Sequence, residues 1–266
     1  FRHLSYEAEL AAKRGFVQDA LQRIGHLGIE VPPVLPSPVQ NRYRNKAQYP
    51  VAANAKGELI YGFYASRSHR IVPCEDCLLQ PETVNKIAVR TAQLLSQMGV
   101  PAYNESTHTG LVRHIYLRRG GHSGQIMLCL VLARSALPRA EELASTLAAE
   151  FPEITTVLLN INAAKTNVIL GQQNTVLHGP GFIEDTFCGV PLRLGPLSFS
   201  QVNTPGAEQL FGLAKTYAAL QPGDTLLDLY CGAGVIGLSM AAEAEQLIGV
   251  EVVPESIENP RASAQH

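Results

Sequence analysis

The chain lacks several features that would place it in a specialised class of protein. It contains no tryptophan, only 17% of its residues are charged, and its formal net charge is −2. A net charge this small means that any nucleic-acid surface must be local rather than global. No apolar run approaches the roughly 20 residues that span a bilayer, and no signal-peptide pattern opens the chain. We therefore expect a cytoplasmic protein with no membrane partner.

Cysteine is also scarce, with five residues scattered along the chain: Cys74, Cys77, Cys129, Cys188 and Cys231. The odd number and the absence of a secretory signal argue against a disulfide framework. A reducing compartment is the better expectation. With 266 residues, of which 46% are hydrophobic, the chain has room for about two globular domains.

The stretch 224–251 carries the clearest chemical signal. An apolar run with Asp228 near its end passes through Tyr230 into closely spaced glycines, a helical stretch, and a second apolar run that ends in Glu251. This order predicts a strand, a tight turn, a helix and a second strand. Glycines at Gly232 and Gly234 let a ligand approach the backbone, and a carboxylate ending the second strand can accept hydrogen bonds from a ribose diol. The pattern indicates an adenosine-type cofactor.

Two cofactors fit this turn. The glycines match the G-x-G-x-x-G of dinucleotide-binding enzymes, which would make the protein a nicotinamide-dependent oxidoreductase, but a lone match is weak. The surrounding sequence DLYCGAG (228–234) instead resembles the first motif of S-adenosylmethionine-dependent methyltransferases. Cys231 lies within this motif and is the obvious candidate nucleophile by position.

Cationic residues gather in two candidate strands. Arg42, Arg44 and Lys46 alternate with other residues in NRYRNKAQYPV (41–51), so in a strand they would share one face. A second strip, which contains Arg67, follows the candidate strand 59–64. A single strip of this kind is usually a solvated strand face. Two strips in adjacent candidate strands favour contact with phosphates.

Cys74 and Cys77 form a C-x-x-C pair. The spacing fits half of a metal site, a thioredoxin-type redox pair opening a helix, or two ordinary thiols. A zinc site would need a second pair of ligands at similar spacing, which the sequence does not offer.

The remaining pattern predicts an α+β order for the middle of the chain. A helix over 5–24 and a proline-rich linker over 31–40 come first. The expected elements that follow are strands at 41–51 and 59–64, a helix at 81–98, a hairpin of strands at 110–119 and 125–133, a helix at 138–150, strands at 155–161, 168–170, 175–177 and 182–187, and a helix at 205–220.

Several segments, taken together and in order, resemble the bacterial RNA (uracil-5-)-methyltransferase family. They are HLSYEAELAAKR, YRNKAQYPV, the GFY-to-SHRIVPCEDCLLQ stretch, TGLVRHIYLR, SFSQVNTPGAEQLF, LDLYCGAGVIGL and GVEVVPESIENPRASA. The resemblance implies α/β plus α+β architecture: a helix at 1–27 that packs on the methyltransferase domain, a central RNA-binding domain at 28–195, and the first part of a Rossmann-like domain at 196–266.

The resemblance also implies a function. Such enzymes transfer a methyl group from S-adenosylmethionine to C5 of a uridine, after a cysteine thiolate has added to C6. Methylation of 23S ribosomal RNA, without an obligate protein partner, is the expectation for this chain. A tRNA substrate and a non-catalytic RNA-binding fragment remain the alternatives.

The matching positions assign roles to individual residues. The implied cofactor-binding residues are Gln201, Asp228, Tyr230, Gly232, Gly234 and Glu251. Candidate RNA contacts are Arg42, Arg44, Lys46 and Arg67. The family's nucleophilic cysteine and glutamate base are expected downstream of His266, so none of the residues present is expected to be catalytic and Cys231 is expected to be a bystander.

Members of the family often hold a [4Fe-4S] cluster on four cysteines, and Cys77 matches the fourth. The other three would precede the HLSY segment, where this chain begins at Phe1. A cluster is therefore expected only if residues upstream of Phe1 supply the other three cysteines. The chain as given resembles a family member that is incomplete at both ends.

Overall fold

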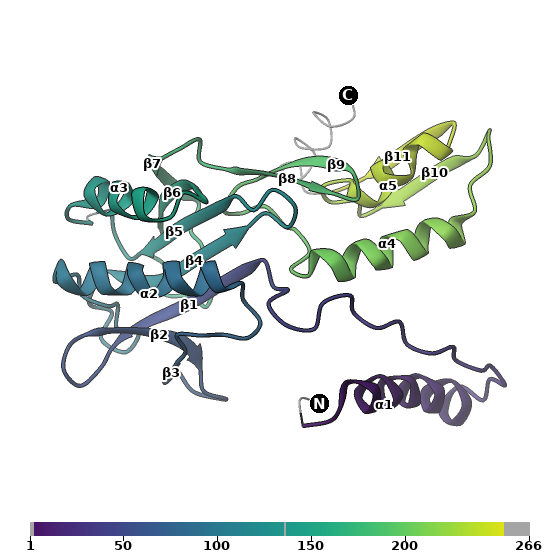
Figure 1. Ribbon diagram of the computed structural model, residues 1–266, viewed down its shortest axis with the longest axis horizontal. Coiled ribbons are helices and arrows are strands. Elements are labelled where there is room, and N and C mark those ends of the chain that lie inside the picture. Colours follow the sequence, from purple (N-terminus) through teal and green to yellow (C-terminus); the bar gives the residue numbers. More distant parts are fainter. Residues whose placement is uncertain (1–2, 136, 253–266) are drawn as a thin grey trace. The chain divides into compact units, whose positions relative to one another are not determined.

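The computed structural model describes residues 3–135 and 137–252, which divide between two compact units, residues 1–40 and 41–266 (Figure 1). The predicted division of the chain at residues 27 and 195 stays a prediction. The last part of the resembling segment GVEVVPESIENPRASA lies outside the described residues.

The first unit contains the predicted N-terminal helix, α1 (Tyr6–Asp19), which continues as the π-helix η1 (Ala20–Ile24). The helix begins at Ser5, whose hydroxyl accepts a hydrogen bond from the Ala8 N–H and so satisfies one of the first free donors. None of the α1 residues is buried.

Polar contacts hold an extended segment to this helix. Gln18 donates to the Ile29 carbonyl and accepts from the Val31 N–H, each at 2.7 Å. Arg14 donates to the Val31 carbonyl at 2.7 Å. Within residues 3–40, side-chain hydrogen bonds to the backbone therefore take the place of an apolar core.

A seven-stranded mixed sheet is the centre of the second unit, in the spatial order β3-β2-β1-β4-β5-β6-β7. Its strands are β1 (Lys46–Ala53), β2 (Leu59–Tyr64), β3 (Ile71–Pro73), β4 (Val112–Arg119), β5 (Ile126–Leu132), β6 (Ile154–Ile161) and β7 (Gln173–His178). Neighbouring strands are antiparallel except β5 and β6, which are parallel because the helix α3 (Ala140–Glu150) connects them.

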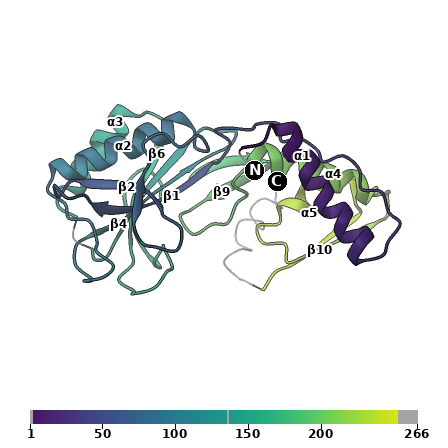
Figure 2. The same cartoon turned by 90° about the horizontal axis from the view of Figure 1, so that it is seen from below.

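Two helices cover one face of this central sheet (Figure 2). The helix α2 (Glu82–Gln97) buries Ile87, Thr91 and Leu95 along one stripe, because residues three or four apart share a helix face. Ile87 and Leu95 pack into a core with sheet residues such as Leu117 and Leu128, which are fully buried.

The other face carries a second core. The hairpin β8 (Ile183–Phe187) and β9 (Val190–Leu194) packs there together with the helix α4 (Thr204–Ala218). Phe211 of α4 meets Phe187 edge to face, with ring centroids 5.4 Å apart. Cys129 is fully buried in this core, so it is a packing residue.

The predicted strand–helix–strand unit at 224–251 is present. The strands β10 (Thr225–Leu229) and β11 (Gln246–Val250) form a parallel pair, joined through the helix α5 (Val235–Met240) and the 3-10 turn η2 (Ala241–Glu243). With the mixed central sheet, this unit confirms the predicted class of α/β plus α+β.

Two strand predictions were wrong. Residues 168–170 form no strand, because the Asn162 amide donates to the carbonyls of Val168 and Ile169 and takes the place of a neighbouring strand. β9 was not predicted at all. It follows a two-residue turn, Cys188 and Gly189, in which both φ angles are positive (50° and 79°), as in a type I′ hairpin.

Candidate active site

The glycine-rich loop after β10 has an unusual backbone. Tyr230, Gly232 and Gly234 have φ angles of 58°, 54° and 67°. Glycine adopts such angles freely, whereas a tyrosine held there costs about 1–2 kcal/mol. Tyr230 is also 85% exposed, so no core contact explains its conformation. Strain in an exposed aromatic residue of this kind is typical of ligand-binding loops.

Glu251 is tied to this loop. Its carboxylate accepts hydrogen bonds from the N–H groups of Gly232 and Val252, both at 2.8 Å. The Cys231 N–H donates to the Val250 carbonyl at 3.0 Å. The end of β11 and the glycine loop therefore lie side by side, as is needed for a ligand to contact both.

Asp228 has a structural role that the sequence did not reveal. Its Oδ2 accepts from the Gly237 N–H at 2.9 Å and so joins β10 to α5. A Cβ at Gly237 would lie 2.9 Å from this oxygen and 2.8 Å from Leu247, which explains the third glycine of the motif. A direct contact between Asp228 and the cofactor stays a prediction.

A cavity of about 220 Å³ opens beside the loop and brings several predicted residues together. Gln201, Tyr230 and Gly232 line it, whereas Asp228, Gly234 and Glu251 do not. Its remaining lining residues are Phe187, Leu192, Phe199, Ser200, Phe211, Cys231, Ala233, Val235 and Ile236. Apolar walls with a few polar groups suit an adenosine-type ligand.

The loop that carries Gln201 is held by the central sheet. Arg118 donates to the carbonyls of Gly195 and Ser198, and Tyr116 donates to that of Pro196. Asn45 completes this set, as its amide donates to the Gln201 carbonyl at 2.9 Å. Sequence reasoning missed these anchors, because their partners lie about 80 to 156 residues away.

Cys231 lines the cavity, but its environment does not favour a thiolate. Partial burial raises the pKa of the Cys231 thiol, and the neighbouring carboxylates of Asp228 and Glu251 raise it further. Because the thiolate is the nucleophile, a raised pKa argues against attack by this residue. That Cys231 is a bystander stays a prediction.

The pair Cys74 and Cys77 does not open a helix. Both residues precede α2, which begins only at Glu82, so a thioredoxin-type arrangement is wrong. Cys77 is buried, and burial together with the neighbouring Cys77 raises the pKa of the Cys74 thiol. In residues 3–135 and 137–252, no group of three or more His, Cys, Asp or Glu side chains could hold a metal ion. Two thiols do not complete the four-cysteine set of a [4Fe-4S] cluster.

The four predicted RNA contacts do not share one face. Arg42 precedes β1 in a left-handed conformation (φ 57°) and forms an ion pair with Asp76, so the prediction of one cationic strand face was wrong. Arg44 and Lys46 stay together at the start of β1, where Arg44 donates to the Lys46 carbonyl. Arg67 lies separately, exposed in the turn between β2 and β3.

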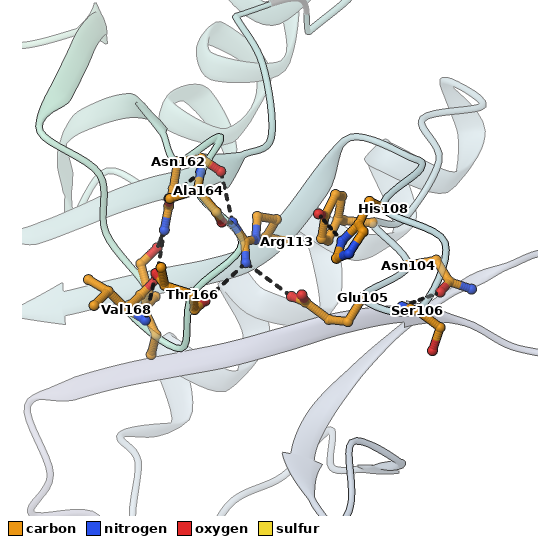
Figure 3. Close-up of polar contacts among 11 residues, drawn as sticks. Asn104, Glu105, Ser106, His108, Arg113, Asn162, Ala164, Thr166 and Val168 are labelled. Atoms are coloured by element: carbon orange, nitrogen blue, oxygen red, sulfur yellow. Dashed lines mark hydrogen bonds and ion pairs between the residues drawn. The ribbon is translucent and has the colours of Figure 1, made fainter.

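Arg113 of β4 is a buried cation (Figure 3). Its guanidinium donates to the carbonyls of Asn162 and Ala164 at 2.9 and 2.7 Å, and it forms an ion pair with Glu105. It also stacks over Tyr103, 4.7 Å from the ring centre. Arg113 therefore fixes two loops of the central sheet and is unavailable to a ligand.

No helix among the described residues combines the length and apolar character needed to cross a bilayer.

Known proteins match this chain over nearly its whole length. An uncharacterised RNA methyltransferase of Oceanobacillus iheyensis is 37% identical over 266 residues, and one of Listeria innocua is 39% identical over 264. Each alignment covers 99% of this chain and 58% of the relative, so the chain spans little more than half the length of these proteins.

The fold also matches a solved structure, that of Pyrococcus abyssi tRNA (uracil-54, C5)-methyltransferase in complex with S-adenosyl-L-homocysteine. The TM-score is 0.78 at 24% identity, covering 99% of this chain and 60% of the other. The family described as tRNA (Uracil-5-)-methyltransferase matches residues 5–265. The chain therefore belongs to the tRNA (uracil-5-)-methyltransferase family of RNA methyltransferases.

Proposed function

We propose that this protein methylates C5 of a uridine in RNA with S-adenosylmethionine as methyl donor, and that its substrate is 23S ribosomal RNA. The observation that carries the proposal is the cavity beside the glycine loop. It combines Gln201, Tyr230 and Gly232 at one place, in a chain of this methyltransferase family. The solved P. abyssi relative, in complex with S-adenosyl-L-homocysteine, supports the same cofactor class.

Each proposed cofactor contact follows from the placement of a residue. Tyr230 and Gln201 line the cavity and would contact the adenosine or methionine parts. Glu251 directly follows β11 and lies next to the loop, where a carboxylate can accept hydrogen bonds from the ribose hydroxyls. The left-handed glycines Gly232 and Gly234 would let the methionine part pass close to the backbone.

The chemistry requires activation of the base. C5 of uracil is a weak nucleophile, and addition of a thiolate to C6 moves an electron pair into an enolate that makes C5 nucleophilic. C5 then takes the methyl group, a base removes the C5 proton, and the C6–sulfur bond breaks to release the thiolate. We propose none of the described residues as this nucleophile.

Methyl transfer tests the proposal directly. The purified full-length protein is incubated with labelled S-adenosylmethionine and either unmodified 23S ribosomal RNA or unmodified tRNA, and the RNA is digested to nucleosides. We expect labelled 5-methyluridine from the ribosomal RNA. Label from tRNA alone would correct the substrate, and the absence of 5-methyluridine from both digests would refute the activity.

We extend the proposal to a [4Fe-4S] cluster with Cys77 as one ligand, but only for a longer protein that supplies the other ligands. Two thiols, one of them buried, are too few to hold it within the described residues. Iron analysis of the anaerobically purified full-length protein is the test. Full-length protein without iron would mean that Cys77 is not a ligand.

A further inference from the structure

Three cations lie together where β1 begins and β4 ends, without a carboxylate among them. Lys46 and Arg118 are directly opposite each other in the antiparallel pair β1–β4. Arg44 binds the Lys46 carbonyl through its Nε at 3.1 Å. Among residues 3–135 and 137–252, no ion pair joins an acidic side chain to any of the three. We call Arg44, Lys46 and Arg118 the cationic cluster.

Such an arrangement is unfavourable by itself. Like charges at directly opposed positions of two strands destabilise the pair. Burial strengthens the repulsion, because Arg118 is only 1% exposed and Lys46 is half-buried. Burial and the charges of Arg118 and Arg44 lower the pKa of the Lys46 ammonium accordingly. The three positive charges therefore destabilise the folded state at this end of β1 and β4, and their presence has to be explained by something other than folding.

The side chain of Arg118 is only partly satisfied. Two of its nitrogens donate to the carbonyls of Gly195 and Ser198, which orient the guanidinium without neutralising its charge. Its Nε is buried and has no hydrogen-bond partner within the described part of the chain. Arg118 is therefore a fixed, buried positive charge behind the more accessible Lys46 and Arg44.

We propose that the cationic cluster binds one phosphate group of the RNA backbone, with Lys46 and Arg44 in contact with its oxygens and Arg118 as a buried charge behind them. This site rests on the proposed RNA substrate and adds to it a defined anchoring point. An anion placed there would convert the repulsion among three cations into attraction.

The position of the cluster gives the phosphate a function. Arg118 also holds the loop that carries Gln201, and Asn45 lies between Arg44 and Lys46 while donating to the Gln201 carbonyl. A phosphate at the cluster would therefore fix the RNA against the same segment that lines the cofactor cavity. The anchor would place the RNA in register with the site of methyl transfer.

The first experiment measures the salt dependence of RNA binding. Loss of one phosphate contact reduces the slope of log affinity against log salt by about 1. We expect this reduction for Lys46→Gln but not for Lys46→Arg, which keeps the charge. Lys56→Gln is the matched control, because Lys56 is exposed in the turn at the opposite end of β1. A wild-type slope in Lys46→Gln would overturn the phosphate site.

The second experiment needs no substitution. Lysine acylation followed by mass spectrometry gives the pH midpoint of reactivity for each amine. The Lys46 midpoint should lie below the ordinary value of a lysine amine in free protein and should rise when RNA is bound. An unchanged Lys46 midpoint on saturation with RNA would contradict the proposal.

These outcomes are separable from failure of the proposed function. Methyl transfer to RNA together with a wild-type slope in Lys46→Gln would remove the phosphate site alone. Absence of RNA binding by the wild-type protein would remove both.

Discussion

The central sheet and the β10–β11 sheet bury their strands very differently. All seven residues of β5 are buried, and so are seven of the eight residues of β4. No residue of β10 or β11 is buried, and Leu227, Leu229 and Val250 are each about half exposed. One sheet has helices on one face and a hairpin with α4 on the other, whereas the other sheet packs mainly against α5.

The difference shows what positions the candidate active site. The glycine loop and β11 are fixed by local hydrogen bonds, such as the one from the Gly232 N–H to Glu251. The Gln201 loop is fixed by Arg118 of the well-buried sheet and by Asn45, which directly precedes β1. The central sheet therefore serves as the rigid support for one wall of the cofactor cavity.

Matched truncations in the two sheets should show the largest contrast. Leu128→Ala removes a fully buried side chain of β5 and should lower the free energy of unfolding by about 3–5 kcal/mol. Leu227→Ala in β10 removes a side chain that is 54% exposed and should cost less than about 1 kcal/mol. Chemical denaturation measures both, and equal losses would contradict the contrast in burial.

A buried histidine should make the central sheet sensitive to acid. Burial and the neighbouring Arg113 lower the pKa of His114 from 6.5 to about 4. Because the unfolded chain binds the proton more tightly, stability is complete above pH 6.5 and falls as the pH drops towards 4. The loss amounts to about 3 kcal/mol.

The variant His114→Leu tests this assignment. Its free energy of unfolding should change much less between pH 6.5 and pH 4 than that of the wild type, whatever its stability at neutral pH. A wild-type pH profile in the variant would mean that another group controls acid sensitivity.

A smaller effect is expected at the end of β11. Glu251→Gln keeps the shape of the side chain but removes the charge that would bind the ribose hydroxyls, so S-adenosyl-L-homocysteine should bind about tenfold more weakly, equivalent to about 1.4 kcal/mol. Isothermal titration calorimetry measures the affinity. Glu245→Gln, at an exposed position just before β11, is the control. Unchanged affinity in Glu251→Gln would remove the ribose assignment.

The smallest predicted effect concerns the support from the central sheet. Asn45→Ala removes the hydrogen bond to the Gln201 carbonyl and should weaken binding of S-adenosyl-L-homocysteine about fivefold, since one such bond contributes about 1 kcal/mol. Asn162→Ala, which removes comparable side-chain bonds to the carbonyls of Val168 and Ile169, should not affect this affinity. Equal effects in both variants would point to general destabilisation instead.

The sequence predicted well those elements that depend on local patterns. The strand–turn–helix–strand order at 224–251 follows from spaced glycines and apolar runs, and α4 follows from the proline near its start. The buried strand β5 likewise follows from a continuous apolar run at the predicted strand 125–133. In each case, neighbours in sequence determine the structure.

Features that depend on distant partners were not predictable. Arg42 leaves the expected strand because Asp76, 34 residues away, binds its guanidinium. Arg113 can be buried because backbone carbonyls around Asn162 accept hydrogen bonds from its guanidinium. β9 was missed because Pro191 weakens the strand signal of this segment. Two signals could have revealed the strand: the alternation of the apolar residues Val190, Leu192 and Leu194, which are buried, and the turn at Cys188 and Gly189 before them.

The most direct test of the candidate site is a pair of calorimetric titrations of the wild-type protein, one with S-adenosyl-L-homocysteine and one with a nicotinamide dinucleotide. Both ligands carry an adenosine, so the comparison isolates the part of the ligand that faces the glycine loop. We predict binding of S-adenosyl-L-homocysteine and none of the dinucleotide. Binding of the dinucleotide without S-adenosyl-L-homocysteine would contradict the assignment of the cavity beside Gln201 and Tyr230.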